Sequence, residues 1–157
     1  MKRILYLTEM FVGMLAVISA VYALMVFFEM KWLSDRVYPV AGTMLPEWLD
    51  DFKWSATIGI IVASIVSLFW YALSVLRLKF NHWNRNYVVY WRLLFFGAVL
   101  PPTIFGYLFT RETLFGSGWA YTFYALNSIL IYYVTSAFFS PPSVKYTPFG
   151  AKYIRRW

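Results

Sequence analysis

Four long stretches without a charged residue constrain this 157-residue chain more than any other feature of its sequence. They cover Met10–Phe28, Trp54–Leu76, Leu93–Thr110 and Thr113–Val144, with lengths of 19, 23, 18 and 32 residues. A helix of about 20 apolar residues crosses the hydrocarbon core of a bilayer. The first three stretches therefore each predict one transmembrane helix. The fourth begins with a turn-like Phe-Gly-Ser-Gly sequence, so its helix is expected over 119–139.

The chain is therefore predicted to be an all-α integral membrane protein, a single four-helix transmembrane domain with short loops. Its spans are expected at about 10–29, 54–76, 90–109 and 119–139, followed by a tail over 140–157. The composition agrees, because 61% of the residues are hydrophobic, whereas soluble domains average roughly 45–50%. The first uncharged stretch is longer than the roughly 7–15 apolar residues of a signal peptide, so we interpret it as an uncleaved helix.

The distribution of charge predicts the orientation of these spans. If the N-terminus is inside, ten of the 14 basic residues lie in inner segments, and six of the seven acidic residues, Glu29 included, lie outside. Lysine and arginine accumulate in the cytoplasmic loops of membrane proteins. Both termini are therefore predicted to be cytoplasmic, and the membrane is expected to be a bacterial inner membrane.

Basic residues beside aromatic ones mark the inner loop and the tail. The inner loop contains the single histidine of the chain, and the tail follows Pro141 and Pro142, which are expected to end the fourth helix. Such segments can lie on anionic lipid head groups or bind an acidic partner protein. The alternative is that the cations only fix the orientation of the spans. The predicted docking residues are Arg77, Lys79, His82, Arg85, Arg92, Lys145, Lys152, Arg155 and Arg156.

The first outer loop contains a short amphipathic pattern between Pro46 and Lys53. Trp48 and Phe52 fall on one side of a helix that begins at Pro46, and acidic residues fall on the other side. This pattern predicts a short interfacial helix on the outer leaflet. A simple re-entry turn, with its tryptophans anchored at the interface, explains the same composition equally well.

Two spans carry features that are typical of helix packing. In the second span a small residue recurs at every fourth position, and small side chains allow membrane helices to approach closely. We expect this stripe to pack against the first span, although an oligomer seam would use the same pattern. In the fourth span a single amide is expected to hydrogen-bond to another helix. The predicted packing or seam residues are Ser55, Gly59, Ala63, Ser67 and Asn127.

Two further features leave open whether a span lines a pore. Pro101 and Pro102 follow Gly97 in the middle of the third span, and they predict a hinge with a kink or break near 98–100. The alternative is a static kink that fits the helix to its neighbours. One face of the fourth span carries hydroxyl groups, which either bond between helices or line a water-filled path in an oligomer. This face contains Tyr121, Tyr124, Ser128, Tyr132 and Thr135.

Groups for catalysis or for cofactor binding are scarce. The chain has one histidine and no cysteine, and the predicted span boundaries leave no acidic residue in the core of a span. We therefore predict no catalytic, cofactor-binding or metal-binding residues, no cofactor and no enzymatic activity. Coupling to an ion normally needs an ionisable residue inside the membrane, so ion-coupled transport is not expected either.

These features favour a non-enzymatic inner-membrane subunit that anchors, senses or regulates through a cytoplasmic partner protein. In size and span count the chain resembles small four-span proteins of accessory bacterial systems, namely colicin-immunity proteins, conjugative exclusion proteins and the membrane subunit of phage-defence systems such as Kiwa. This resemblance implies a role in phage defence, immunity or exclusion. An oligomeric pore or channel, and a structural subunit of a larger membrane complex, are the alternatives.

The expected partners follow from the same pattern of charge. Anionic membrane lipids and a cytoplasmic protein are expected on the inner side, and a homo-oligomer is an open alternative. A net charge of +7 would suggest nucleic acid in a soluble protein, but here topology and lipid head groups explain it. Direct nucleic-acid binding is therefore not expected.

Overall fold

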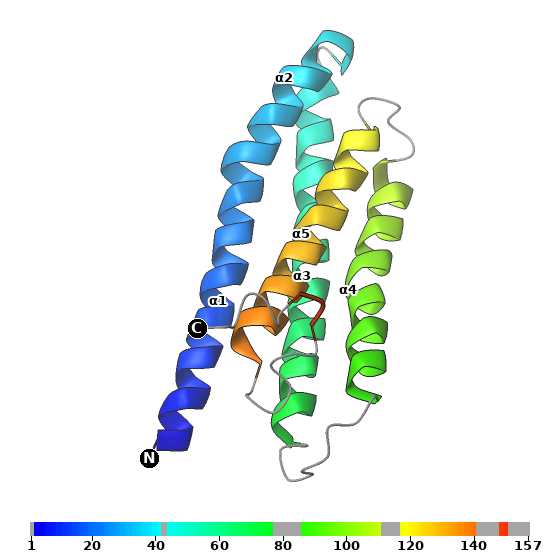
Figure 1. The fold of residues 1–157 in the computed structure, drawn as a ribbon. Helices are drawn as coiled ribbons and strands as arrows, with labels where there is room; N and C mark the ends of the chain where they lie inside the picture. Colours follow the sequence, from blue (N-terminus) through cyan, green and yellow to red (C-terminus); the bar gives the residue numbers. More distant parts are fainter. Residues whose placement is uncertain (1, 42–43, 77–85, 111–116, 141–147, 151–157) are drawn as a thin grey trace.

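The computed structural model is a bundle of long helices and describes residues 2–41, 44–76, 86–110, 117–140 and 148–150 (Figure 1). Four helices in this part of the chain are long and apolar enough to cross a membrane, which confirms an all-helical, multi-pass membrane protein. By length and composition, the segments that can cross a membrane are Thr8–Arg36, Leu45–Ser74, Tyr87–Leu108 and Gly118–Phe139. The elements are α1 (Lys2–Leu24), the π-helical turn η1 (Met25–Glu29), α2 (Met30–Ala41), α3 (Leu45–Leu76), α4 (Asn86–Thr110) and α5 (Ser117–Phe139).

The first span runs through α1, η1 and α2 as one rod (Figure 1). Its buried side chains recur at every fourth residue across the π turn, at Val21, Met25, Glu29 and Leu33. In a regular α-helix, residues four apart drift by about 40° around the axis, because one turn takes 3.6 residues. The wider π turn, in which the Met30 N–H bonds to the Met25 carbonyl, counteracts that drift. It therefore keeps one stripe of side chains facing the bundle.

The small-residue stripe of α3 is buried inside the bundle, from Ser55 through Gly59 to Ser67. At its centre, a Cβ added to Gly59 would lie 3.1 Å from Cβ of Pro102 on α4. The expectation that this stripe packs against the first span is therefore wrong at this point. The proline ring occupies the space that the missing side chain leaves, and close packing of this kind holds membrane helices together.

Within the first span, α1 packs mainly against α5, whereas α2 packs against α3. Gly13 of α1 lies so close to the ring of Phe139 that an added Cβ would be 2.1 Å from it. On the other side of α5, Gly106 of α4 approaches the ring of Tyr124 equally closely. Glycines thus let α5 sit between α1 and α4, while α3 covers it from a third direction (Figure 1).

The two central prolines do not interrupt α4, which is helical from Asn86 to Thr110. Pro102 is buried against α3, whereas Gly97 has no atom within 4 Å of an added Cβ. Prolines remove backbone donors and so free carbonyl oxygens in the preceding turn. The carbonyls affected are those of Gly97 and Ala98, and in the next position the Thr103 hydroxyl donates to the Val99 carbonyl at 2.7 Å. No break near 98–100 is present in this described helix.

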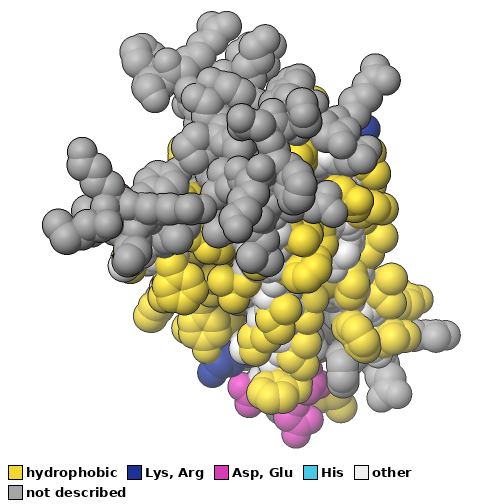
Figure 2. Space-filling view, turned by 90° about the horizontal axis from the view of Figure 1, so that it is seen from below, with side chains coloured by type: hydrophobic (Ala, Val, Ile, Leu, Met, Phe, Trp, Pro, Cys, Tyr) yellow, Lys and Arg dark blue, Asp and Glu magenta, His cyan; other side chains and the backbone are white. Residues whose placement is uncertain are grey.

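The residues of the expected interfacial helix, from Pro46 to Lys53, form the first turns of α3. Trp48 and Phe52 are buried in the bundle, where their rings stack on one another with centroids 6.1 Å apart. The amphipathic pattern is therefore explained by packing inside the protein. The outer surface of the described bundle is largely apolar, as expected for helices that face lipid, and acidic side chains gather at one edge (Figure 2).

Candidate intramembrane carboxyl site

Glu29 is the side chain that departs most from the sequence analysis. It is the last residue of η1, lies inside the first membrane-crossing segment and is only 2% exposed. Its assignment to the outer loop was wrong, because Glu29 belongs to a continuous helical segment that runs from α1 into α2. The uncharged stretch ends at Phe28, but the helix continues beyond it to Ala41. Glu29 is buried in the bundle, whereas Phe27 and Phe28 are exposed.

Asn127 of α5 is the partner of this carboxyl group. Its Nδ2 donates a hydrogen bond to Oε2 of Glu29 at 2.9 Å, and its side chain is 1% exposed. Asn127 lies ten residues after Ser117 and twelve before Phe139, which places it about 15 Å and 18 Å from the two ends of α5 at 1.5 Å per residue. The pair therefore lies deep in the bundle and joins the first span to the last.

An aromatic layer lies beside the pair, about one helical turn away along α2 and α5. Trp32, three residues after Glu29, contacts Trp119 and Phe123 of α5 with ring centroids 4.8 and 5.5 Å away. Phe52 of α3 contacts the same Phe123 and stacks on Tyr124 at 5.3 Å. These rings join α2, α3 and α5 above the carboxyl group. They therefore lie between Glu29 and the end of the bundle at which α2 meets the start of α3.

Five buried polar side-chain atoms in the described part of the chain have no hydrogen-bond partner. The Tyr124 hydroxyl lies near Ser55, but the two oxygens do not reach hydrogen-bond geometry. Buried polar groups are paired in most proteins, so a cluster of unpaired ones is unusual. The atoms are Trp48 Nε1 and Ser55 Oγ in the first third of α3, and Tyr124 OH, Asn127 Oδ1 and Ser128 Oγ in the first half of α5.

Glu29 has no basic side chain as an ion-pair partner within the described residues. Arg36 instead places its guanidinium over the Trp32 ring, 4.9 Å from the centroid. A charge inside a membrane is costly unless it is paired or neutralised. Charged residues on the neighbouring elements are exposed, namely Glu9 on α1, Lys31, Asp35 and Arg36 on α2, and Glu47, Asp50, Asp51 and Lys53 on α3.

The hydroxyl face of the fourth span lies inside the chain's own bundle. Tyr124, Ser128, Tyr132 and Thr135 are all buried, and Tyr121 is half-buried. The Tyr132 hydroxyl donates to the Trp91 carbonyl at 3.1 Å, and the Trp91 indole donates to Ser136 at 2.9 Å. This face therefore serves packing between α4 and α5, which favours the first of the two uses that the sequence left open.

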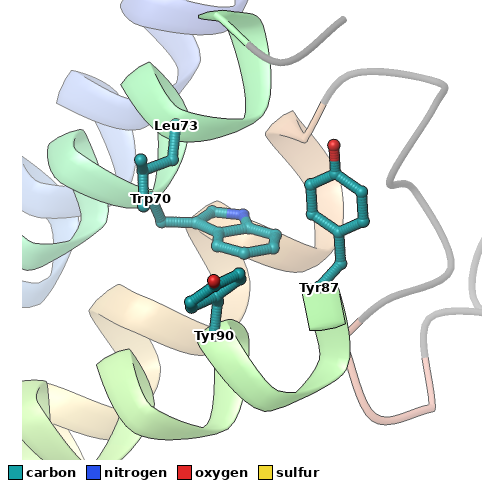
Figure 3. A pocket seen from close by; sticks show the side chains of 4 residues that line it. All are labelled: Trp70, Leu73, Tyr87 and Tyr90. Carbon is teal, nitrogen blue, oxygen red and sulfur yellow. The ribbon is translucent and has the colours of Figure 1, made fainter. Parts of the chain in front are cut away.

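Two cavities lie elsewhere on the described surface. A groove of about 550 Å³ between α1 and α3 is lined by Tyr22, Asp50, Asp51, Lys53, Trp54 and Thr57. An aromatic cavity of about 100 Å³ lies between α3 and α4, lined by Trp70, Leu73, Tyr87 and Tyr90 (Figure 3). Neither of them borders the carboxyl group of Glu29.

Most of the predicted docking residues lie outside the described residues. Arg92 is described, and its side chain is exposed on α4. In the tail, the short turn 148–150 lies against α5, where the Tyr133 hydroxyl donates to the Phe149 carbonyl at 2.5 Å. Gly150 adopts a φ of +77° there, a conformation that favours glycine. The docking residues outside the described part are Arg77, Lys79, His82, Arg85, Lys145, Lys152, Arg155 and Arg156.

A comparison of the chain with protein-family models, curated proteins and solved structures gave no match. Function is therefore argued from the site alone. The described residues hold no group of three or more histidine, cysteine or acidic side chains that could bind a metal ion. The site's chemistry rests on one carboxyl group, one amide and the hydroxyl groups around them.

A signal for Glu29 was present in the sequence. Val21, Met25, Glu29 and Leu33 form one repeat with a spacing of four, so the acid continues an apolar stripe. A strictly solvent-exposed acid would not be expected on that stripe. Extending the helical pattern through the first charged residue, instead of ending the span there, would have placed Glu29 inside.

Proposed function

We propose that this chain is a non-enzymatic polytopic inner-membrane subunit that senses or regulates through a cytoplasmic partner protein, in an accessory bacterial system such as phage defence, immunity or exclusion. The observation that carries the sensing role is the buried Glu29–Asn127 pair. Replacing buried polar pairs by apolar side chains is often neutral or stabilising, so packing alone gives little reason for an acid here. Ionisable residues inside membranes generally belong to functional sites.

The orientation belongs to the same proposal. Ten basic residues on the inner side against four on the outer side support cytoplasmic termini, because short cytoplasmic loops collect lysine and arginine. The inner loop and the tail then face the cytoplasm beside anionic lipid head groups. A partner with an acidic surface would meet Arg155 and Arg156 at the end of the tail.

The path from the pair to the cytoplasmic side runs along α5. Tyr133 follows Asn127 by six residues, about 9 Å along the helix. Its hydroxyl holds the turn 148–150 through the Phe149 carbonyl. A shift of α5 that follows a change at Glu29 would therefore displace the attachment of the tail. This connection supports an output on the cytoplasmic face.

Co-purification from native membranes in mild detergent tests the proposal. We expect a soluble protein to co-purify with the wild-type chain and to be lost when Arg155 and Arg156 are both replaced by alanine. Glu29→Ala breaks the pair and should change the recovered amount several-fold, whereas Glu9→Gln, at an exposed acid, should not. If no soluble protein depends on either the tail or Glu29, the chain does not act in this way.

A further inference from the structure

We infer that the Glu29–Asn127 pair is a proton-binding site. In it Glu29 is protonated, and its O–H group donates a hydrogen bond to Oδ1 of Asn127. In the same pair, Nδ2 of Asn127 donates to Oε2 of Glu29. The acid and the amide would then hold each other through two reciprocal hydrogen bonds. This inference names the ligand of the site on which the proposed function rests.

The hydrogen-bonding capacity of the two side chains favours the proton. An asparagine amide offers two donors and one carbonyl acceptor, and an ionised carboxylate offers acceptors only. Oδ1 of Asn127 is buried and has no hydrogen-bond partner among the described residues. A carboxylate cannot satisfy that oxygen, but a protonated carboxylic acid has one O–H group that can. The unpaired oxygen lies on the side chain that already bonds to Glu29.

Charge balance leads to the same ligand. An ionised Glu29 would place one negative charge deep in the bundle, with a neutral amide as its hydrogen-bond donor. One positive charge neutralises it, whereas a divalent cation would leave one excess positive charge. A proton supplies that single charge without further ligand atoms, whereas a metal cation needs several oxygen ligands. Binding and release exchange one proton between Glu29 and water, with no other reactant.

Among the side chains at this site, Glu29 is the one that can exchange a proton. The titratable side chains of α5 are tyrosines, phenols whose ordinary titration lies far above neutral pH. Glu9 on α1 and the acidic and basic residues of α2 and α3 lie at exposed positions, as described above. The aromatic layer formed by Trp32, Phe52 and Phe123 separates the pair from the outer charges.

Infrared spectroscopy of the purified full chain in lipid vesicles tests the inference. The chain has four glutamates, and labelling their carboxyl carbons with ¹³C identifies their C=O stretch. At neutral pH we expect the band of a protonated carboxylic acid in the wild type and in Glu9→Gln, and no such band in Glu29→Gln. Asn127→Leu removes both reciprocal hydrogen bonds and should move the band to higher frequency. The amide introduced by Glu29→Gln can form the same two bonds to Asn127, so this variant is expected to fold.

The outcomes separate a proton from a metal cation and from no ligand. If the band is lost when Na⁺ replaces K⁺ at constant pH, the site binds Na⁺ and the inference is wrong. If no Glu29-dependent band appears from alkaline to mildly acidic pH in the wild type, Glu29 stays ionised and the inference is also wrong. The infrared measurement needs no partner protein. A negative infrared result therefore does not decide the co-purification test, and a negative co-purification result does not decide the infrared test.

Discussion

Replacing the amide of the buried pair gives the sharpest test of how much the pair stabilises the bundle. Asn127→Leu leaves the carboxyl group of Glu29 buried without its 2.9 Å donor. An unsatisfied buried polar group costs about 1–3 kcal/mol, although interhelical hydrogen bonds in membrane proteins average about 0.6 kcal/mol and reach about 1.7 kcal/mol. We therefore expect Asn127→Leu to lower the free energy of unfolding by about 1–2 kcal/mol.

The double variant should recover the stability that Asn127→Leu loses. Glu29→Leu combined with Asn127→Leu removes both polar partners, and such replacements by apolar groups are often neutral or stabilising. The double variant should therefore be at least as stable as Asn127→Leu alone, and close to the wild type. Thr122→Val, at an exposed position of α5 whose hydroxyl bonds to the Gly118 carbonyl of its own helix, is the control and should change little.

The assay is reversible unfolding in mixed micelles with increasing denaturing detergent, followed by tryptophan fluorescence and by circular dichroism. The wild type, Asn127→Leu, Glu29→Leu and the double variant together give the coupling energy between the two side chains. Additive effects within about 0.3–0.5 kcal/mol are typical of residues that do not interact. A coupling energy in that range would refute the pairing, and so would a double variant that is less stable than either single variant.

Two other predictions concern helix packing and orientation. Gly106→Ala should destabilise the protein by about 1–3 kcal/mol, because its Cβ would lie 2.1 Å from the Tyr124 ring, whereas Gly97→Ala on the same helix meets no atom within 4 Å and should have little effect. Unfolding titrations of both variants check this, and equal stability would contradict the close contact. Because the chain has no cysteine, single cysteines report topology cleanly: Lys152→Cys should react with a membrane-impermeant thiol reagent only from the cytoplasmic side, and Asp50→Cys only from outside. The reverse pattern would overturn the orientation.

The number of spans could be predicted from the sequence, but the continuation of the first helix past Glu29 was missed when the uncharged stretch set its end. Uncharged stretches locate apolar helices well, because each charge left in lipid is costly. The same rule ends a span at its first charged residue, whereas the helix continues through Glu29 to Ala41. The free-energy cost of burying the Glu29 carboxyl group is reduced by a hydrogen-bond partner on a helix that is distant in the sequence. Only the tertiary structure shows that Asn127 provides it.

The partner of each packing surface was also beyond the sequence. The small-residue stripe of α3 was visible as a pattern, but Gly59 could face any neighbour. The structure places Pro102 of α4 there, so the proline that suggested a hinge serves as a packing residue against α3. Asn127 was expected to bond to another helix, and the sequence did not indicate that its acceptor would be an acid.

Solid-state NMR of the chain in lipid bilayers tests the central claim most directly, namely that Glu29 meets Asn127 inside the membrane. The chain has four glutamates and four asparagines, so ¹³C at the glutamate carboxyl carbons and ¹⁵N at the asparagine amides give few pairs. We predict one strong through-space ¹³C–¹⁵N contact, which disappears in Asn127→Leu and persists in Glu9→Gln. A wild-type spectrum without that contact, or a Glu29 carboxyl signal broadened by a water-soluble paramagnetic ion, would contradict the account.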